Sequence, residues 1–394
     1  MEMKIELQKE LAQEAPVALE EVRVPRYGHF LEAFVPGTTF KHPRGLTVYP
    51  AFAQTFATTF MQANPLYLNE PYARAHGFSG LPLSPLMVLN VVLSLGVQND
   101  SEQAVAHLGY YNVAFPRPAY AGDTLSSKTT VLSCRTRGMD ENKQPRPGVV
   151  RVRTEGFNQE GQNVVLFERA ILIPAQKAGR EAGSEQRAEI EQASAWPLSL
   201  SLTVSRPLAV APLTGRETYF EALGEGEIIV HANGRTVTDE HIAWTYRLGN
   251  THPLHYDRVY CEARTGPLSG EPVVYGGLVF AWLEGLASRD TSENALWDLG
   301  YTEGYHTQPV VAGDTLYAVS RVLRKEEGPP ALEAGLVTLQ LIGVKNLSGE
   351  EALQRYGAAL FQKELSKPRS ARLPEKVFEV ERRLLVKRAA GWNS

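Results

Sequence analysis

The chain has very little cysteine and no long apolar run. Its 394 residues include only Cys134 and Cys261, which lie far apart and lack any CxxC or Cys/His spacing. A disulfide framework and a zinc site are therefore excluded. The most apolar stretch, residues 81–95, is interrupted by polar residues and falls short of the roughly 20 apolar residues of a membrane helix. The start of the chain, MEMKIE, lacks the apolar core of a signal peptide, so we expect a cytoplasmic protein without a membrane segment.

Neither sign of charge dominates, and the common nucleotide-binding loops are missing. A net charge of -4 and a hydrophobic content of 43% describe an ordinary globular chain and do not favour a nucleic-acid partner. The sequence contains no GxxxxGK[ST] loop, no GxGxxG after a strand and no GxSxG elbow. We therefore expect no metal and no cofactor.

What the chain does contain is an internal repeat. Residues 64–69 (NPLYLN) are echoed by residues 252–257 (HPLHYD), and residues 121–125 (AGDTL) recur letter for letter at 312–316. The first pair is 188 residues apart and the second 191, so the copies run in the same order. This agreement indicates a duplicated fold of two modules.

The repeat and a change of composition suggest where the modules begin and end. Residues 175–197 are rich in Ala, Gly, Glu, Gln and Arg and are interpreted as a linker. The sequence thus predicts an N-terminal module over 1–174 and a C-terminal module over 198–363. Residues 364–394 are basic and are predicted to form an extension that is solvated or packs on a partner subunit.

Each copy combines a buried helix with antiparallel strands. Apolar runs without strand alternation follow a Pro or Gly at 85–93 and 277–286, which is typical of a buried helix. Two β-rich runs around the turn at 158–161 predict a long hairpin, and we expect its repeat to run from 335–341 to 358–361. The fold class is therefore α+β, with a helix wrapped by an antiparallel sheet as one possible topology.

The second copy resembles a known family. Residues 250–257 (NTHPLHYD), followed by residues 272–278 (PVVYGGL), resemble the active-site stretch of MaoC-like, (R)-specific enoyl-CoA hydratases. The resemblance covers both halves and implies a double hotdog fold, an acyl-CoA substrate, no cofactor besides CoA, and a possible homodimer. The first half, with Leu108-Gly109-Tyr110 and the AGDTL run, is most similar to mesaconyl-CoA hydratases (β-methylmalyl-CoA dehydratases). A hydratase or dehydratase acting on a short branched or dicarboxylic acyl-CoA is thus implied.

The chemistry of water addition explains why such residues belong together. His255 suits the acid/base task because an imidazole titrates close to neutral pH. By the family spacing, Asn250 stands where a carboxylate is usual, and an amide can hold water but cannot take its proton. Either His255 performs both proton transfers, or a carboxylate such as Asp257, Asp239 or Glu284 joins the site, or activity is altered or lost. Asp257 is alternatively interpreted as the N-cap of a helix, with no part in catalysis.

Further residues are candidates for the thioester and the substrate. Gly276 and Gly277 can place a backbone N–H at a helix N-terminus, where it stabilises a developing oxyanion. Tyr275, His252 and Tyr67 are predicted to contact substrate, although His252 also reads as a locally hydrogen-bonded residue. Three arginines are weaker candidates for contact with the phosphates of CoA: Arg247, Arg258 and Arg264.

The first copy loses each of these roles. Gln62 and Tyr67 stand in place of the acid and the histidine, and Ser84-Pro85 replaces the glycine pair. Proline has no N–H but fits the first turn of a helix, so the helix start is kept and the donor is lost. We expect the first half to be catalytically silent.

Two alternatives to a hydratase remain open. A hotdog thioesterase would use a carboxylate on the central helix to activate water, and Glu284 is the candidate for it. A noncatalytic acyl-CoA-binding protein is suggested by the asparagine at position 250 and by the losses in the first half.

Overall fold

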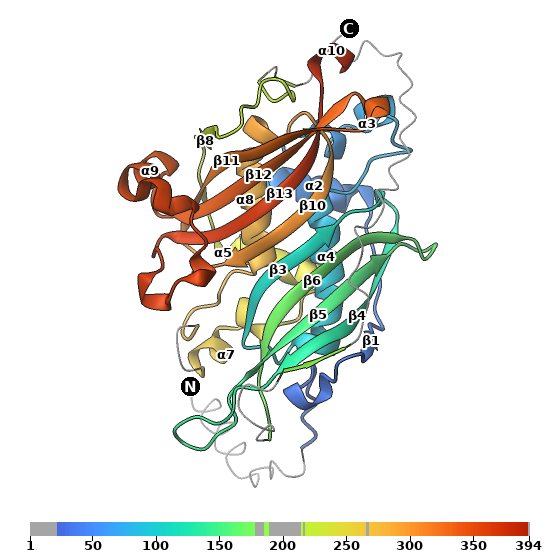
Figure 1. Cartoon of the computed structure of the whole chain (residues 1–394). Coiled ribbons are helices and arrows are strands. Elements are labelled where there is room, and N and C mark those ends of the chain that lie inside the picture. Colours follow the sequence, from blue (N-terminus) through green and yellow to red (C-terminus); the bar gives the residue numbers. More distant parts are fainter. Residues whose placement is uncertain (1–21, 178–184, 189–213, 216, 265–267, 393–394) are drawn as a thin grey trace, which may run out of the picture.

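The computed structural model describes residues 22–177, 185–188, 214–215, 217–264 and 268–392. One continuous antiparallel sheet runs through both halves in the order β1-β4-β5-β6-β3-β10-β13-β12-β11-β8. Figure 1 shows the two halves of this sheet meeting edge to edge at β3 and β10, with the long helices α4 and α8 behind it. The major strands are β3 (Ala106–Ala114), β4 (Thr124–Arg135), β5 (Gly148–Phe157), β6 (Asn163–Ile173), β10 (Ala295–His306), β11 (Thr315–Glu327), β12 (Ala334–Lys345) and β13 (Lys376–Lys387).

Shorter elements edge the sheet and connect its strands. The minor strands are β1 (Thr39–Lys41), β2 (Leu46–Thr47), β7 (Glu185–Arg187), β8 (Ile228–Val230) and β9 (Arg235–Thr236). The α-helices are α2 (Pro50–Thr59), α3 (Glu70–Ala75), α4 (Pro85–Gly96), α5 (Asp239–Ile242), α6 (Trp244–Arg247), α7 (Arg258–Glu262), α8 (Gly276–Thr291), α9 (Gly349–Tyr356) and α10 (Ala389–Trp392). The single-turn segments are η2 (Leu31–Ala33), η3 (Pro65–Tyr67), η4 (Val97–Ser101), η5 (Pro253–His255), η6 (Pro330–Leu332), η7 (Gly357–Phe361), η8 (Glu364–Ser366) and η9 (Arg369–Ala371).

The two halves have the same topology and share one core. The strand order β4-β5-β6-β3 of the first half is mirrored by β11-β12-β13-β10 in the second. Every residue of α4 is buried, and α8 is buried over most of its length, which confirms the two predicted helices. Their apolar side chains belong to one large cluster that draws on both halves, and smaller clusters lie within each half. The α+β class is confirmed.

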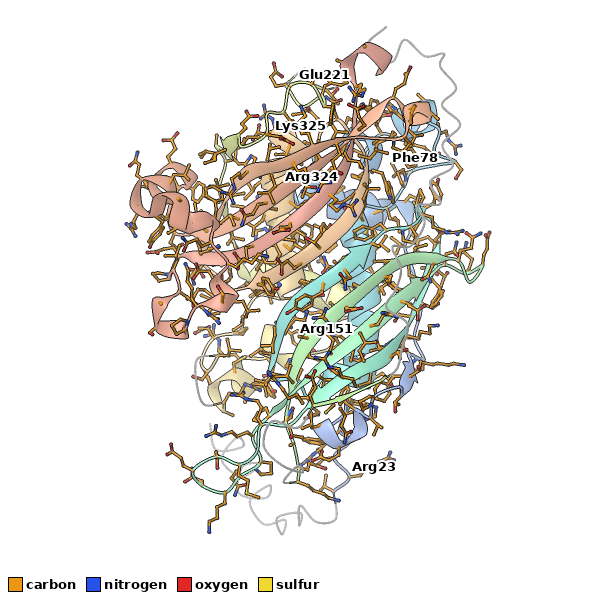
Figure 2. The ribbon with its side chains drawn as sticks, in the orientation of Figure 1. Arg23, Phe78, Arg151, Glu221, Arg324 and Lys325 are labelled. Atoms are coloured by element: carbon orange, nitrogen blue, oxygen red, sulfur yellow. The ribbon has the colours of Figure 1, made fainter. Side chains whose placement is uncertain are left out.

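The outer face of the sheet is partly polar in the first half. Strand β5 alternates between buried and partly exposed residues. Arg151, labelled in Figure 2, lies on the less buried face, where its Cζ is 3.4 Å from the centre of the Tyr111 ring. It also donates to the carboxylate of Glu168 on β6. In the second half, by contrast, α9 and η7 cover this face, where Val319, Ile342 and Val344 are buried against them.

The predicted end of the C-terminal module is wrong. Strand β13 lies inside the sheet between β10 and β12, so the module extends well beyond residue 363 and residues 376–387 are not a solvated extension. The reason for the error is chemical: Lys376, Glu379, Arg382 and Lys387 give the strand a charged appearance, yet all four are buried.

The two predicted hairpins have different outcomes. The first is confirmed, because β5 pairs with β6 around the turn in which Gly161 has a φ of +74°. In the second, residues 357–361 form η7 rather than a strand, α9 is inserted, and β12 pairs with β13. Most of the predicted linker lies outside the described residues, but residues 185–187 form β7, which pairs with β4.

No helix in the described part of the chain is both long and apolar enough to span a bilayer.

Candidate active site

His255 ends the short η5 turn and is fixed in one tautomer. Its Nδ1 lies 2.8 Å from the carbonyl oxygen of Val273, which can only accept, so Nδ1 carries the hydrogen. The Nε2 lone pair is therefore the basic group that the ring offers. Burial and the neighbouring His252 lower the pKa of His255 to about 3. The imidazole is a neutral base at physiological pH.

Asn250 precedes this turn and is oriented by its backbone. The side chain is 1% exposed, and its oxygen accepts a hydrogen bond of 3.0 Å from the N–H of His252. Because that contact requires the oxygen, the amide nitrogen is the group left to offer to the cavity described below. Asn250 is thus a donor that can hold the oxygen of a water molecule or hydroxyl group.

His252 has a structural task. Its Nδ1 accepts from the N–H of Leu254 at 3.2 Å, and its Nε2 lies 2.9 Å from the carbonyl oxygen of Ala104 in the first half. Asn64 makes the matching contacts in the first copy, to the N–H of Leu66 and the carbonyl oxygen of Ser292. Both nitrogens of His252 are occupied, which supports the alternative of a locally hydrogen-bonded residue. The ring also lines the cavity described below, so its predicted contact with substrate stays a prediction.

Helix α8 points its N-terminus at the same place. The first N–H groups of an α-helix have no partner within the helix and carry a partial positive charge. Gly276 must be glycine because a Cβ there would lie 2.5 Å from Nε2 of His306. A Cβ at Gly277 would lie 1.8 Å from the side-chain oxygen of Asn90, whose amide nitrogen donates to the Gly277 carbonyl. Of the two predicted glycines, only Gly276 lines the cavity.

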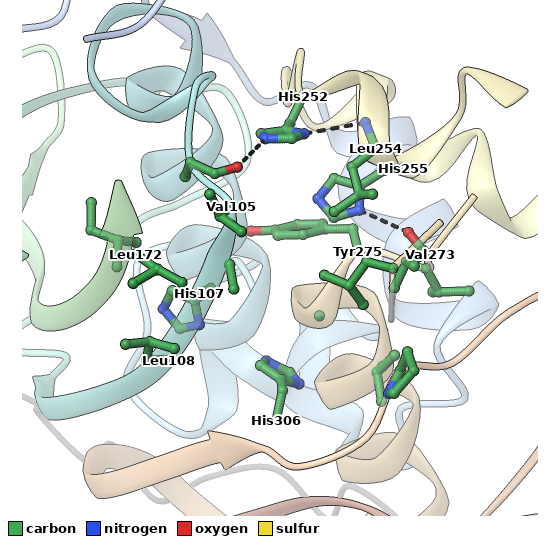
Figure 3. A pocket seen from close by; sticks show the side chains of 18 of the residues that line it. Val105, His107, Leu108, Leu172, His252, Leu254, His255, Val273, Tyr275 and His306 are labelled. Carbon is green, nitrogen blue, oxygen red and sulfur yellow. Dashed lines mark hydrogen bonds between the residues drawn. The ribbon is translucent and has the colours of Figure 1, made fainter. Parts of the chain in front are cut away.

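These groups surround one cavity of about 550 Å³ between the two halves (Figure 3). Asn250, His255 and Gly276 line it from the second half, and β3 and β6 close it from the first. Tyr275 also lines the cavity, and its ring centre is 5.4 Å from that of His255. The structure thus brings together the predicted base, amide, helix N-terminus and tyrosine.

The carboxylates considered as replacements for the usual acid lie elsewhere. Asp257 caps α7 by accepting from the N–H of Tyr260 at 2.9 Å, as Asn69 caps α3, so the cap reading is confirmed. Asp239 is exposed at the start of α5. Glu284 is buried but does not line the cavity. Among the described residues, no carboxylate takes the place of the missing acid at position 250.

The equivalent place in the first copy is filled by an ion cluster, which we call the Arg382 cluster. Arg382 donates to Glu284 at 2.8 Å and to Asp298 at 2.9 Å, and Gln62 donates to the other oxygen of Glu284. Tyr67 is 6% exposed beside this cluster and does not line the cavity, which contradicts its predicted contact with substrate. The cluster supports the prediction that the first copy is silent.

Comparison with known proteins identifies the family. The family model described as mesaconyl-CoA hydratase matches residues 13–349. The chain belongs to the mesaconyl-CoA hydratase family. It is 30% identical to a mesaconyl-CoA hydratase from Cereibacter sphaeroides, over 81% of this chain and 90% of that protein. It is 28% identical to a beta-methylmalyl-CoA dehydratase from Chloroflexus aurantiacus, over 81% of this chain and 89% of that protein.

Solved structures agree with this membership of the mesaconyl-CoA hydratase family. A MaoC domain dehydratase from Chloroflexus aurantiacus superimposes with a TM-score of 0.78 at 26% identity, covering 93% of this chain and 99% of the other. A double hotdog protein from Mycobacterium tuberculosis gives a TM-score of 0.67 at 19% identity, covering 91% and 98%. The double hotdog fold implied by the sequence is confirmed.

Two cavity residues of this family member were missed by sequence reasoning. His107 on β3 and His306 at the end of β10 both line the cavity. The one sequence signal that could have indicated them is a histidine at a core-facing position of a strand. Of the three arginines proposed for CoA phosphates, only Arg264 lines the cavity, where the structure adds Arg169 and Arg372.

The low pKa of His255 predicts an unusual pH profile for this member of the mesaconyl-CoA hydratase family. A base must be deprotonated to act, and burial lowers the folded-state pKa, so activity should persist as pH falls through 6.5 and decline only toward about 3. We expect kcat/KM for hydration at about pH 5 to stay above half its value at about pH 7, measured where circular dichroism shows intact folding. An inflection near pH 6.5 would contradict this assignment.

Proposed function

We propose that this protein is a hydro-lyase that adds water to a dicarboxylic 2-enoyl-CoA such as mesaconyl-CoA, or removes it in the reverse direction. The observation that carries the proposal is the bond from His255 to Val273, because it leaves a basic nitrogen beside the N-terminus of α8. Family membership and the named relatives support the reaction and the substrate class.

A single imidazole can move both protons. Nε2 of His255 removes a proton from water held by Asn250, and the oxygen bonds to the β-carbon of the enoyl group. The electrons of the double bond move toward the thioester oxygen, where the N–H of Gly276 stabilises the enolate. His255 then returns the proton to the α-carbon on the same face. Dehydration follows the same steps in reverse.

The ends of the cavity suit different parts of the ligand. Its inner wall includes buried apolar residues of the first half, such as Val97 and Ile171. Arg264 and Arg372 lie at the more open end, where Leu365 is 43% exposed, and they suit the phosphates of CoA. The proposal requires no cofactor beyond CoA itself. Cytoplasmic location and a homodimer stay predictions from the sequence.

The thioesterase alternative is not favoured by the geometry. Glu284 accepts from Arg382 and Gln62 and lies outside the cavity, so it has no access to a thioester carbonyl there. The noncatalytic alternative is not favoured, because His255 and Gly276, the proposed base and oxyanion donor, line the same cavity. Release of free CoA from an enoyl-CoA, or binding without turnover, would support these alternatives respectively.

Asn250→Asp tests whether the asparagine is a specialisation. Aspartate keeps the bond to the His252 N–H but adds a negative charge next to the β-carbon. Two like charges about 5 Å apart cost about 3 kcal/mol at an effective dielectric constant of about 20, which is about a 100-fold effect. We expect kcat/KM to fall by that order for mesaconyl-CoA, whose carboxylate lies on the β-carbon, and to be maintained or raised for crotonyl-CoA. An equal loss on both substrates would show that Asn250 is needed only for packing.

A further inference from the structure

His107 and His306 form a pair on the wall of the cavity that the proposed mechanism does not use. Their ring centres are 5.9 Å apart, and Tyr110 packs against both rings. Figure 3 shows both side chains at the cavity, across from His252. His306 lies next to the proposed oxyanion donor, since its Nε2 is 2.5 Å from where a Cβ of Gly276 would be.

The pair lacks hydrogen-bond partners within the described residues. Both ring nitrogens of His107 and Nε2 of His306 are buried without one. Leaving a buried polar atom unpaired is unfavourable, and three such atoms in one cavity wall point to a ligand as the missing partner. A half-turn about the Cβ–Cγ bond exchanges ring nitrogens with carbons, so each ring can present a nitrogen to the cavity.

The silent first-copy site shows which residues stand at the equivalent positions where no catalysis is expected. Leu108-Gly109-Tyr110 is repeated as Leu299-Gly300-Tyr301, which aligns His107 with Asp298 and His306 with Phe115. The ring of Phe115 packs on Tyr301 at 5.7 Å, as the ring of His306 packs on Tyr110 at 5.8 Å. Phenylalanine therefore satisfies the packing, and the imidazole of His306 adds only polarity.

A buried guanidinium donor near the pair suits an anion. Arg169 on β6 lines the same cavity and is 2% exposed. Its Nη2 is held by Asp100 at 3.0 Å, while its Nε is buried without a hydrogen-bond partner within the described residues. In the silent half, Asp298 is neutralised by Arg382. No carboxylate in the described part of the chain forms a hydrogen bond or an ion pair with either imidazole.

Both imidazoles are neutral in the free protein. Burial lowers the pKa of His306 to about 4, and burial, His306 and Arg169 lower the pKa of His107. The titratable groups around the pair are Tyr110 on β3, Arg169 on β6, and Tyr275 and His255 beside α8. An anion that enters this wall can therefore bring in a proton, because a charge buried beside an imidazole favours the imidazolium.

We propose that His107 and His306 bind the distal carboxylate of a dicarboxylic acyl-CoA and take up a proton with it, so that this pair selects dicarboxylic over monocarboxylic acyl chains. The inference rests on the acyl-CoA ligand of the proposed function. A carboxylate on the β-carbon is three bonds from the thioester carbon, which agrees with the position of His306 beside Gly276.

Binding of unreactive ligands tests the pair independently of catalysis. Methylsuccinyl-CoA and 2-methylbutyryl-CoA share a carbon skeleton and differ by a carboxylate in place of a methyl group. By isothermal titration calorimetry, the wild type should bind methylsuccinyl-CoA at least 10-fold more tightly. His107→Phe and His306→Phe should each weaken methylsuccinyl-CoA binding on the order of 10- to 100-fold and change 2-methylbutyryl-CoA binding less than about 3-fold.

A matched control and a second readout complete the test. Tyr305→Phe, next to His306, removes a hydroxyl that bonds to Glu303, and neither residue lines the cavity, so both affinities should be unchanged. Titrations near pH 7 in buffers of different ionisation enthalpy should show uptake of about one proton with methylsuccinyl-CoA and none with 2-methylbutyryl-CoA. Equal wild-type affinities, or variants that weaken both ligands equally, would overturn the pair's role. Discrimination without any hydration would instead overturn the proposed reaction and leave the pair's role standing.

Discussion

His255→Ala is expected to lower kcat for hydration of mesaconyl-CoA on the order of 100- to 10,000-fold. A positioned acid/base group contributes about that much to the rate. Among the described residues, no other histidine of the cavity wall has its Nδ1 held by the Val273 carbonyl, as His255 does. KM should change far less, because the imidazole acts mainly in the transition state. Initial rates from the ultraviolet absorbance of the conjugated thioester measure both constants.

His252→Asn is the matched control for this loss. The first copy already carries Asn64 in the same turn, with the same bonds to the next helix and to the other half. Asparagine at 252 should therefore keep the loop folded while removing one imidazole from the cavity, and kcat should fall less than 10-fold. Equal losses in the two variants would assign the effect to the loop and not to the base.

Arg382→Met is expected to destabilise the fold by about 3–5 kcal/mol. Removing one partner of a buried ion pair leaves the other charge buried and unpaired. Here the two carboxylates, Glu284 and Asp298, are 6% and 5% exposed, and burial raises the pKa of Asp298 to about 6 even with Arg382 beside it. Urea denaturation followed by circular dichroism gives the change in free energy of unfolding. The cluster lies outside the cavity, so kcat of the folded fraction should be close to that of the wild type.

Arg383→Met, at the next position of the same strand, provides the comparison. Arg383 is exposed, so its replacement should change the free energy of unfolding by no more than about 0.5 kcal/mol. A loss of activity in Arg382→Met at full stability would contradict a structural role for the cluster. It would instead show that the Arg382 cluster takes part in catalysis.

The sequence alone could locate the second-half site because its residues are close together along the chain. Residues 250–255 and 275–276 belong to one loop and one helix start, so their spacing carries the geometry. His107 escaped notice since it meets His306 only through the pairing of β3 with β10, nearly 200 residues apart. Strand β13 was missed for a related reason: the charges that make it look like a solvated tail are neutralised by distant partners such as Glu284.

Asn250 was the largest uncertainty left by the sequence, and the structure shows how its side chain is oriented. Its oxygen is committed to the His252 N–H, so the side chain can only donate toward the cavity. Such a donor suits a water molecule whose proton is taken by His255, and it adds no charge beside a substrate carboxylate. An uncharged side chain at the position where the resemblance to MaoC-like hydratases implies a carboxylate is therefore consistent with a dicarboxylic substrate.

The most direct test of the account is to incubate the wild-type protein with mesaconyl-CoA and to identify the product by mass spectrometry. We predict loss of the conjugated-thioester absorbance and a product heavier by one water molecule, with CoA still attached. Release of free CoA, or binding without any change in mass, would contradict the account.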